Sequence, residues 1–120
     1  MSYAANAYAR TQRTAMTPRE AEAAVLIKAA QLLQAVREDW ANQSGGLAHA
    51  LNFNQRVWTI LVAGATDAQS PLPPELKQNV VNIAMFVFRR MIDTMAEPAA
   101  EKLSALISVN HNLAAGLQGR

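Results

Sequence analysis

Two asparagines sit in the middle of apolar helix faces, and their position limits the chemistry of this chain more than any other feature. Asn54 is surrounded by apolar residues at the three- and four-residue spacing of one helix face, namely Leu47, Ala50, Leu51, Val57, Trp58 and Leu61. The same spacing surrounds Asn110 between residues 103 and 117. A buried amide costs on the order of a kcal/mol or more unless its polar atoms are paired. We therefore predict that both asparagines set the specificity of packing or of partner binding. Replacing either by Leu is expected to leave stability equal or higher while loosening partner choice or oligomeric state.

Residue patterns typical of catalysis are missing from the sequence. His49 and His111 are the only imidazoles, and neither has the spacing of a metal-binding helix. We interpret both as surface or cap residues. Gly45-Gly46 lacks the lysine that follows in a phosphate-binding loop, the serines lie in no nucleophile elbow, and there is no cysteine. The sequence predicts a protein that is not an enzyme, with no catalytic residues, no metal and no cofactor.

Composition indicates one folded domain that works by binding. A chain of 120 residues with 51% hydrophobic and 17% charged residues is too apolar for a disordered protein. The absence of cysteine suits a reducing cytoplasm, and no apolar run approaches the 18 residues of a membrane span, so we expect a cytoplasmic protein without membrane insertion. The net charge is only +2, and the basic residues after the N-terminal arm are interspersed along the sequence with acidic ones. Such a chain has no continuous basic face for phosphates, which does not favour nucleic-acid binding.

Capping residues and apolar spacing predict the first two helices of the domain. Thr17-Pro18-Arg19-Glu20 is a helix start, with Thr17 as N-cap and Pro18 at the first helical position. The helix that follows is expected to end within residues 42–46, and the next to run from Leu47 to Val62 and stop near Gly64. One face of the first is predicted to hold Val25, Ala29, Leu32, Leu33, Val36 and Trp40.

The second half of the chain predicts two more helices after a proline-rich loop at 66–74. The helix carrying residues 76–92 is apolar nearly all round, as expected of a central helix or of one whose outer face a partner covers. Pro98 is predicted to occupy the first turn of the last helix, which should end at Gly116. The predicted fold class is all-α: a small antiparallel helical bundle over residues 17–120, preceded by a basic, aromatic N-terminal arm at 1–16.

Aromatic and basic residues outside the apolar faces are the other candidates for partner binding. Phe86 and Phe88 point to different sides of their helix, about 200° apart, so one is available to a partner. Arg89-Arg90 fits either a solvated helix end or an acidic partner helix. Trp58 is more typical of a core anchor than of a binding residue. The predicted partner-binding residues are Tyr3, Tyr8, Asn54, Trp58, Phe86, Phe88, Arg89, Arg90 and Asn110.

Several short motifs, taken in order, resemble the FlaF family of flagellar biosynthesis regulators. The likeness extends over nearly the whole chain, and it depends on the order and spacing of the motifs together. They are Pro18-Arg19-Glu20, Asn54 with Val57-Trp58, Leu72-Pro73 followed by Asn79 and Asn82, Phe86-Val87-Phe88-Arg89-Arg90, and Leu106-Ile107 with Asn110 and Ala114-Ala115-Gly116-Leu117.

The resemblance implies a cytoplasmic protein that binds flagellin as a secretion chaperone and promotes flagellin synthesis and export together with the regulator FlbT. Flagellin polymerises through terminal amphipathic helices, so its chaperone would offer those helices temporary apolar cover. Two alternatives stay open. One is a helical scaffold or adaptor that self-associates into a homo-oligomer, and the other, less favoured by charge, is a regulator that binds flagellin messenger RNA directly.

Overall fold

The computed structural model describes residues 16–119, so Tyr3, Tyr8 and most of the predicted arm lie outside the described residues. Within 16–119 the chain is helical and contains no strand, which confirms the all-α class. The helices are α2 (Pro18–Glu38), α3 (Trp40–Gln43), α4 (Leu47–Thr66), α5 (Pro74–Ala96) and α6 (Leu103–Leu117), with 3-10 turns at Ser44–Gly46 and Ala100–Lys102. None of these helices is both long and apolar enough to cross a bilayer.

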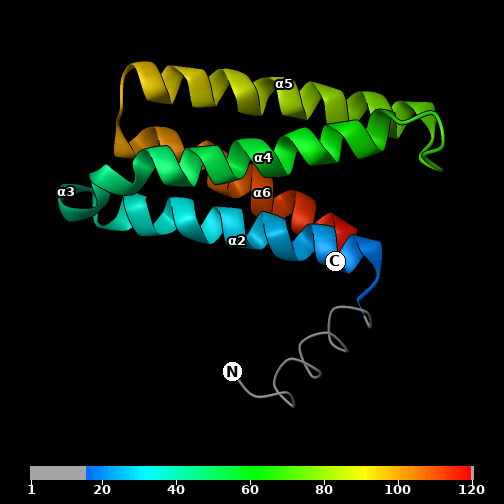
Figure 1. Cartoon of the computed structure of the whole chain (residues 1–120), viewed down its shortest axis with the longest axis horizontal. Helices are drawn as coiled ribbons and strands as arrows, with labels where there is room; N and C mark the ends of the chain where they lie inside the picture. The colour runs from blue at the N-terminus through cyan, green and yellow to red at the C-terminus, as the bar shows by residue number, and fades with distance from the viewer. Residues whose placement is uncertain (1–15, 120) are drawn as a thin grey trace, which may run out of the picture.

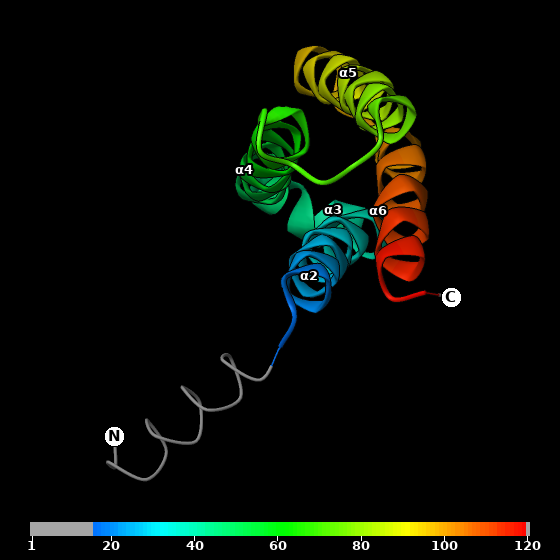
Figure 2. The same cartoon turned by 90° about the vertical axis from the view of Figure 1, so that its right-hand side faces the viewer.

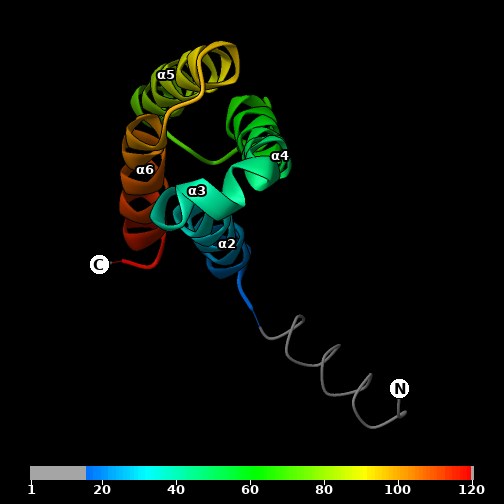
Figure 3. The same cartoon turned by 90° about the vertical axis from the view of Figure 1, so that its left-hand side faces the viewer.

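The four long helices alternate in direction along the chain and pack around one core (Figure 1). Seen from the ends, α2, α4, α5 and α6 follow one another around that core, and α3 crosses from α2 to α4 (Figures 2 and 3). Arg37 of α2 contacts Ser104 of α6, and Gln34 contacts His111, so α2 and α6 are antiparallel. These two helices make the most extensive contact of any pair, whereas α5 packs mainly on α4 and only sparsely on α6.

The start of α2 is as the sequence predicts, but the face it buries is shifted. The Thr17 hydroxyl accepts a hydrogen bond from the Glu20 backbone N–H at 3.1 Å, with Pro18 in the first turn. Leu26, which the prediction left off the buried face, is completely buried, while Val25 is 41% exposed. The assignment of Val25 to the core was wrong because the stripe is centred one residue later. Trp40 belongs to α3, where it is half-buried.

Helix ends in the second half of the chain also differ from prediction. α4 continues through Gly64 to Thr66, whose hydroxyl donates to the Val62 carbonyl at 2.7 Å. Pro98 lies outside α6 because Ala99 after it is extended, and the helix begins only at Leu103. α6 runs through Gly116 to Leu117, and the glycine with a positive φ (76°) is Gly119. The predicted positions of Pro98 and Gly116 were therefore wrong.

α5 lies on the outside of the bundle rather than at its centre. Its fully or nearly buried residues are few and mostly small, namely Ala84, Val87, Met91 and Thr94. The buried hydroxyl of Thr94 donates to the Arg90 carbonyl of the preceding turn at 2.6 Å. Of the two explanations for an apolar α5, the central helix is wrong, and an outer face that a partner covers stays a prediction.

Candidate partner-binding surfaces

The two asparagines that dominate the sequence meet inside the core. Asn54 of α4 and Asn110 of α6 are both completely buried, and the Asn110 amide Nδ2 donates to Asn54 Oδ1 at 2.7 Å. The indole Nε1 of buried Trp58 donates to Asn110 Oδ1 at 2.9 Å, and Asn54 Nδ2 donates to the Met91 sulfur of α5 at 3.4 Å. A single relay of four side chains, Trp58–Asn110–Asn54–Met91, thus links α4, α5 and α6.

The order of donors in this relay follows from the chemistry of its ends. An indole N–H can only donate, so Asn110 must present its oxygen to Trp58 and its NH₂ group to Asn54. Asn54 must then present its own oxygen to Asn110, which leaves its NH₂ to donate to the thioether of Met91, a weak acceptor. No buried side-chain nitrogen or oxygen in the described part of the chain lacks a hydrogen-bond partner. The relay is complete without any second molecule.

These contacts change the interpretation of Asn54, Trp58 and Asn110. Each side chain is wholly enclosed, so a partner could touch it only after the helices separate. Because each amide satisfies the other, the expectation that leucine at either position leaves stability equal or higher is reversed. The spacing of the residues indicates that both amides are buried, but it carries no information that they pair across 56 positions of sequence.

The aromatic and basic candidates on α5 are divided between two sides of the helix. Phe86 is 42% exposed, and the Arg90 guanidinium lies 5.8 Å from the centre of its ring. Phe88 is half-buried and packs against the core. Arg90 also approaches Asp93 at 4.0 Å, whereas Arg89 is exposed. Phe86 and Arg89 therefore lie at the surface, Arg90 contacts Phe86 and Asp93 on its own helix, and Phe88 packs against the core.

Besides Leu76 near its start, the large exposed apolar residues of α5 that were not singled out from the sequence are Met85, Ile92 and Met95. Their exposed fractions are 49%, 69% and 53%, which makes them some of the most exposed large apolar side chains of the described residues. The sequence signal for these residues is that apolar side chains of α5 extend around more of the helix than one buried face requires. The rest of that pattern lies at the surface.

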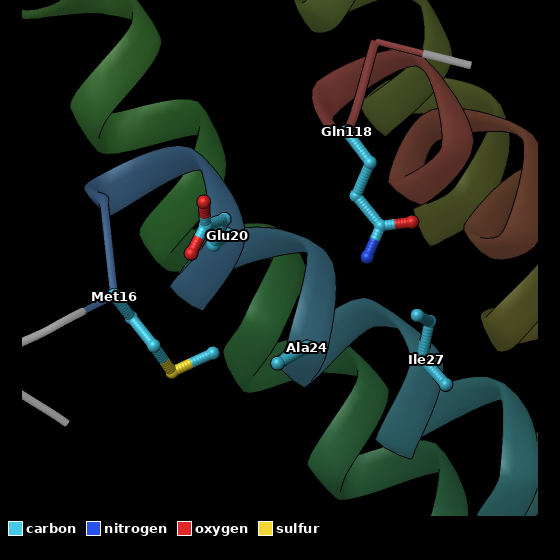
Figure 4. A pocket seen from close by; sticks show the side chains of 5 residues that line it. All are labelled: Met16, Glu20, Ala24, Ile27 and Gln118. Atoms are coloured by element: carbon cyan, nitrogen blue, oxygen red, sulfur yellow. The ribbon is translucent and has the colours of Figure 1, made fainter. Parts of the chain in front are cut away.

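A shallow groove of about 540 Å³ opens between the start of α2 and the end of α6. Figure 4 shows the five side chains that line it: Gln118, directly after α6, and four from α2 and the residues just before it. The others are Met16, Glu20, Ala24 and Ile27. Nothing in the sequence indicated this groove, because it forms only where the fold brings the start of α2 beside the end of α6. Neither histidine lines the groove. His49 is exposed, and His111 is half-buried with its Nε2 3.3 Å from Gln34 Oε1.

Comparison with known families matches residues 4–117 to the family described as flagellar protein FlaF. The chain belongs to the FlaF family. The match confirms the resemblance seen in the motifs and places this FlaF-family chain among flagellar proteins. It includes Tyr8 but begins after Tyr3. A search of curated proteins and a search of solved structures each returned no match.

Proposed function

We propose that this FlaF-family protein acts in the cytoplasm as a flagellar biosynthesis regulator that binds flagellin as a secretion chaperone and promotes flagellin synthesis and export together with FlbT. The observation that carries the proposal is the outer side of α5, which leaves Met85, Ile92 and Met95 exposed in a chain of a flagellar family. Exposed apolar side chains gathered on one helix are typical of protein interaction sites.

The proposed role follows from what an unassembled flagellin has to hide. A subunit that polymerises through amphipathic helices exposes their apolar stripes until it is exported, and a second helical protein can cover a stripe by packing alongside it. Methionine suits such temporary contact, because its flexible, polarizable side chain adapts to different surfaces. This role requires a complementary surface and no catalytic group, so the protein is proposed to bind without catalysing a reaction.

The direct test is co-purification of the intact protein from native cytoplasm, followed by binding measurements with the purified proteins. We expect flagellin to co-purify, and FlbT with it, and we expect the chain to bind purified flagellin after nuclease treatment. Light scattering on the free chain separates the competing scaffold function. A chain that forms a homo-oligomer and binds neither flagellin nor FlbT would contradict the chaperone proposal, and salt-sensitive binding to flagellin messenger RNA would favour direct regulation of the message.

Deleting residues 1–15 is expected to leave the bundle folded and to weaken binding to flagellin or FlbT. The Thr17 side chain caps α2 at Glu20, so the helix begins without help from the residues before it. We expect an unchanged thermal midpoint by circular dichroism and an affinity lowered on the order of tenfold by calorimetry. Substituting Tyr3 and Tyr8 by Ala in the intact chain is the matched control for the rings. Unchanged affinity, or collapse of the fold, would show that the arm is not a binding element.

A further inference from the structure

The exposed apolar residues of α5 form a ridge on a side of the helix that the core does not use. Seven residues make about two turns, so Met85 and Ile92 lie nearly one above the other. Met95 follows almost one turn after Ile92 and is displaced by roughly 60° around the axis toward the buried side. The buried residues of α5, such as Val87 and Met91, lie at other positions around its axis. We call Met85, Ile92 and Met95 the α5 ridge. Two turns of exposed apolar side chains at this spacing match the contact that one helix makes with another.

Phe88 ties the α5 ridge to the core. It lies three residues after Met85 and four before Ile92, so it is next to both on the helix surface. Its ring is half-buried and packs against the core cluster. The backbone beneath the ridge is further held by Met91, which accepts the end of the asparagine relay. The ridge is therefore a formed surface, and a partner helix can dock on it without first ordering α5.

The charge beside the α5 ridge is positive. Arg89 is exposed and lies four residues after Met85 and three before Ile92, which puts it at the edge of the ridge. The nearby carboxylate of Asp93 is already approached by Lys102 at 3.3 Å and Arg90 at 4.0 Å. Among the ion pairs of residues 16–119, none includes Arg89. The cation at the ridge is thus free to meet a carboxylate on another molecule.

This charge argues against a second copy of the chain as the occupant. If two α5 helices paired symmetrically along their ridges in the same direction, the two Arg89 side chains would lie at opposite edges of the contact. Each would then face the edge of the other ridge that Phe88 lines, where there is no carboxylate. If they paired in opposite directions, the two Arg89 side chains would come within about one turn of each other, because Arg89 lies near the middle of the ridge. Pairing in opposite directions brings like charges together in a contact that excludes water, and neither arrangement offers Arg89 a carboxylate that is not already in an ion pair. The ridge favours a partner that supplies the opposite charge.

We propose that the α5 ridge is the docking site for an amphipathic helix that carries carboxylates beside its apolar stripe. The apolar stripe packs on Met85, Ile92 and Met95, and a carboxylate pairs with Arg89. The inference rests on the proposed function, since flagellin is the protein expected to supply this helix, and it adds where on the chain the helix binds and what chemistry it carries.

Calorimetry with purified full-length flagellin as the probe tests the site in the intact protein. Ile92→Glu and Arg89→Glu are each expected to weaken binding about tenfold or more. The matched controls are Ile60→Glu and Arg56→Glu, which make the same changes at exposed positions of α4; Ile60 is 72% exposed. The controls are expected to keep the original affinity within about twofold. All four positions are exposed, so circular dichroism should show the same helix content and thermal midpoint throughout.

The outcomes separate this site from the function on which it rests. If the unaltered chain does not bind flagellin, the proposed function and the docking site both fail. If the unaltered chain binds and Ile92→Glu binds equally well, the ridge is not the site, although the proposed function stands. If Ile92→Glu weakens binding and Arg89→Glu does not, the acidic character of the partner helix is wrong. If Ile92→Glu instead converts a dimer to a monomer by light scattering, the occupant is a second copy.

Discussion

Replacing Asn110 by Leu is expected to destabilise the protein by about 2–5 kcal/mol. The substitution removes the acceptor of the Trp58 indole and the donor to Asn54 Oδ1, so two enclosed polar groups lose their partners at once. Asn54→Leu strands only the Asn110 Nδ2 group, because the thioether of Met91 tolerates the loss of a weak bond, and should cost about 1–3 kcal/mol. Urea unfolding measures both values.

The double variant Asn54→Leu/Asn110→Leu tests whether the two amides stabilise the protein by pairing with each other. With Leu at both positions only the Trp58 N–H remains without a partner, so the double variant should be more stable than Asn110→Leu alone. Asn112→Leu, at an exposed position of α6, is the matched control and should change stability by about 0.5 kcal/mol or less. Strictly additive effects of Asn54→Leu and Asn110→Leu would show that the two amides do not depend on each other.

Elements that depend on local chemistry could be predicted from the sequence. The start of α2 depends on residues within one turn, and Thr17 and Glu20 interact as their spacing requires. Burial of Asn54 and Asn110 follows from apolar neighbours at helical spacing. Helix ends were less predictable, since a glycine ends a helix only where the backbone turns into the left-handed region, and among residues 16–119 that happens at Gly119. No local pattern distinguishes Gly116 from Gly119.

Features that depend on how the helices assemble could not be predicted. The partner of each buried amide is set by bringing α4 and α6 together, which residues 54 and 110 do not encode locally. The apolar pattern of α5 is equally consistent with a central helix and with an outer one. Its outside position becomes clear only once α2 and α6 are seen to pack on each other and α5 to lie chiefly on α4. The candidate surface on α5 is therefore a product of the fold as much as of the sequence.

Small side chains lie where α2 packs against α6, the pair of helices in most extensive contact. Ala30 lies seven residues before Arg37 and four before Gln34, both of which contact α6, so all three share the face toward that helix. Ala30 is completely buried, and the facing helix contributes buried Ala114. Small side chains at a helix contact allow the two axes to come close together. This side of the bundle is thus built for tight packing, in contrast to the sparse contact between α5 and α6.

Ala30→Leu is accordingly expected to destabilise the protein by about 2–3 kcal/mol, because the added carbons have no space between two packed helices. Ala35→Leu is the matched control: it makes the same change at an exposed position of α2 and should be nearly neutral, since leucine is almost as good a helix former as alanine. Unfolding in urea, monitored by circular dichroism, compares the two variants with the original chain. If Ala30→Leu were as stable as Ala35→Leu, α2 and α6 would have to be separated widely enough to hold a leucine. The tight pair that leaves α5 on the outside of the bundle would then not exist.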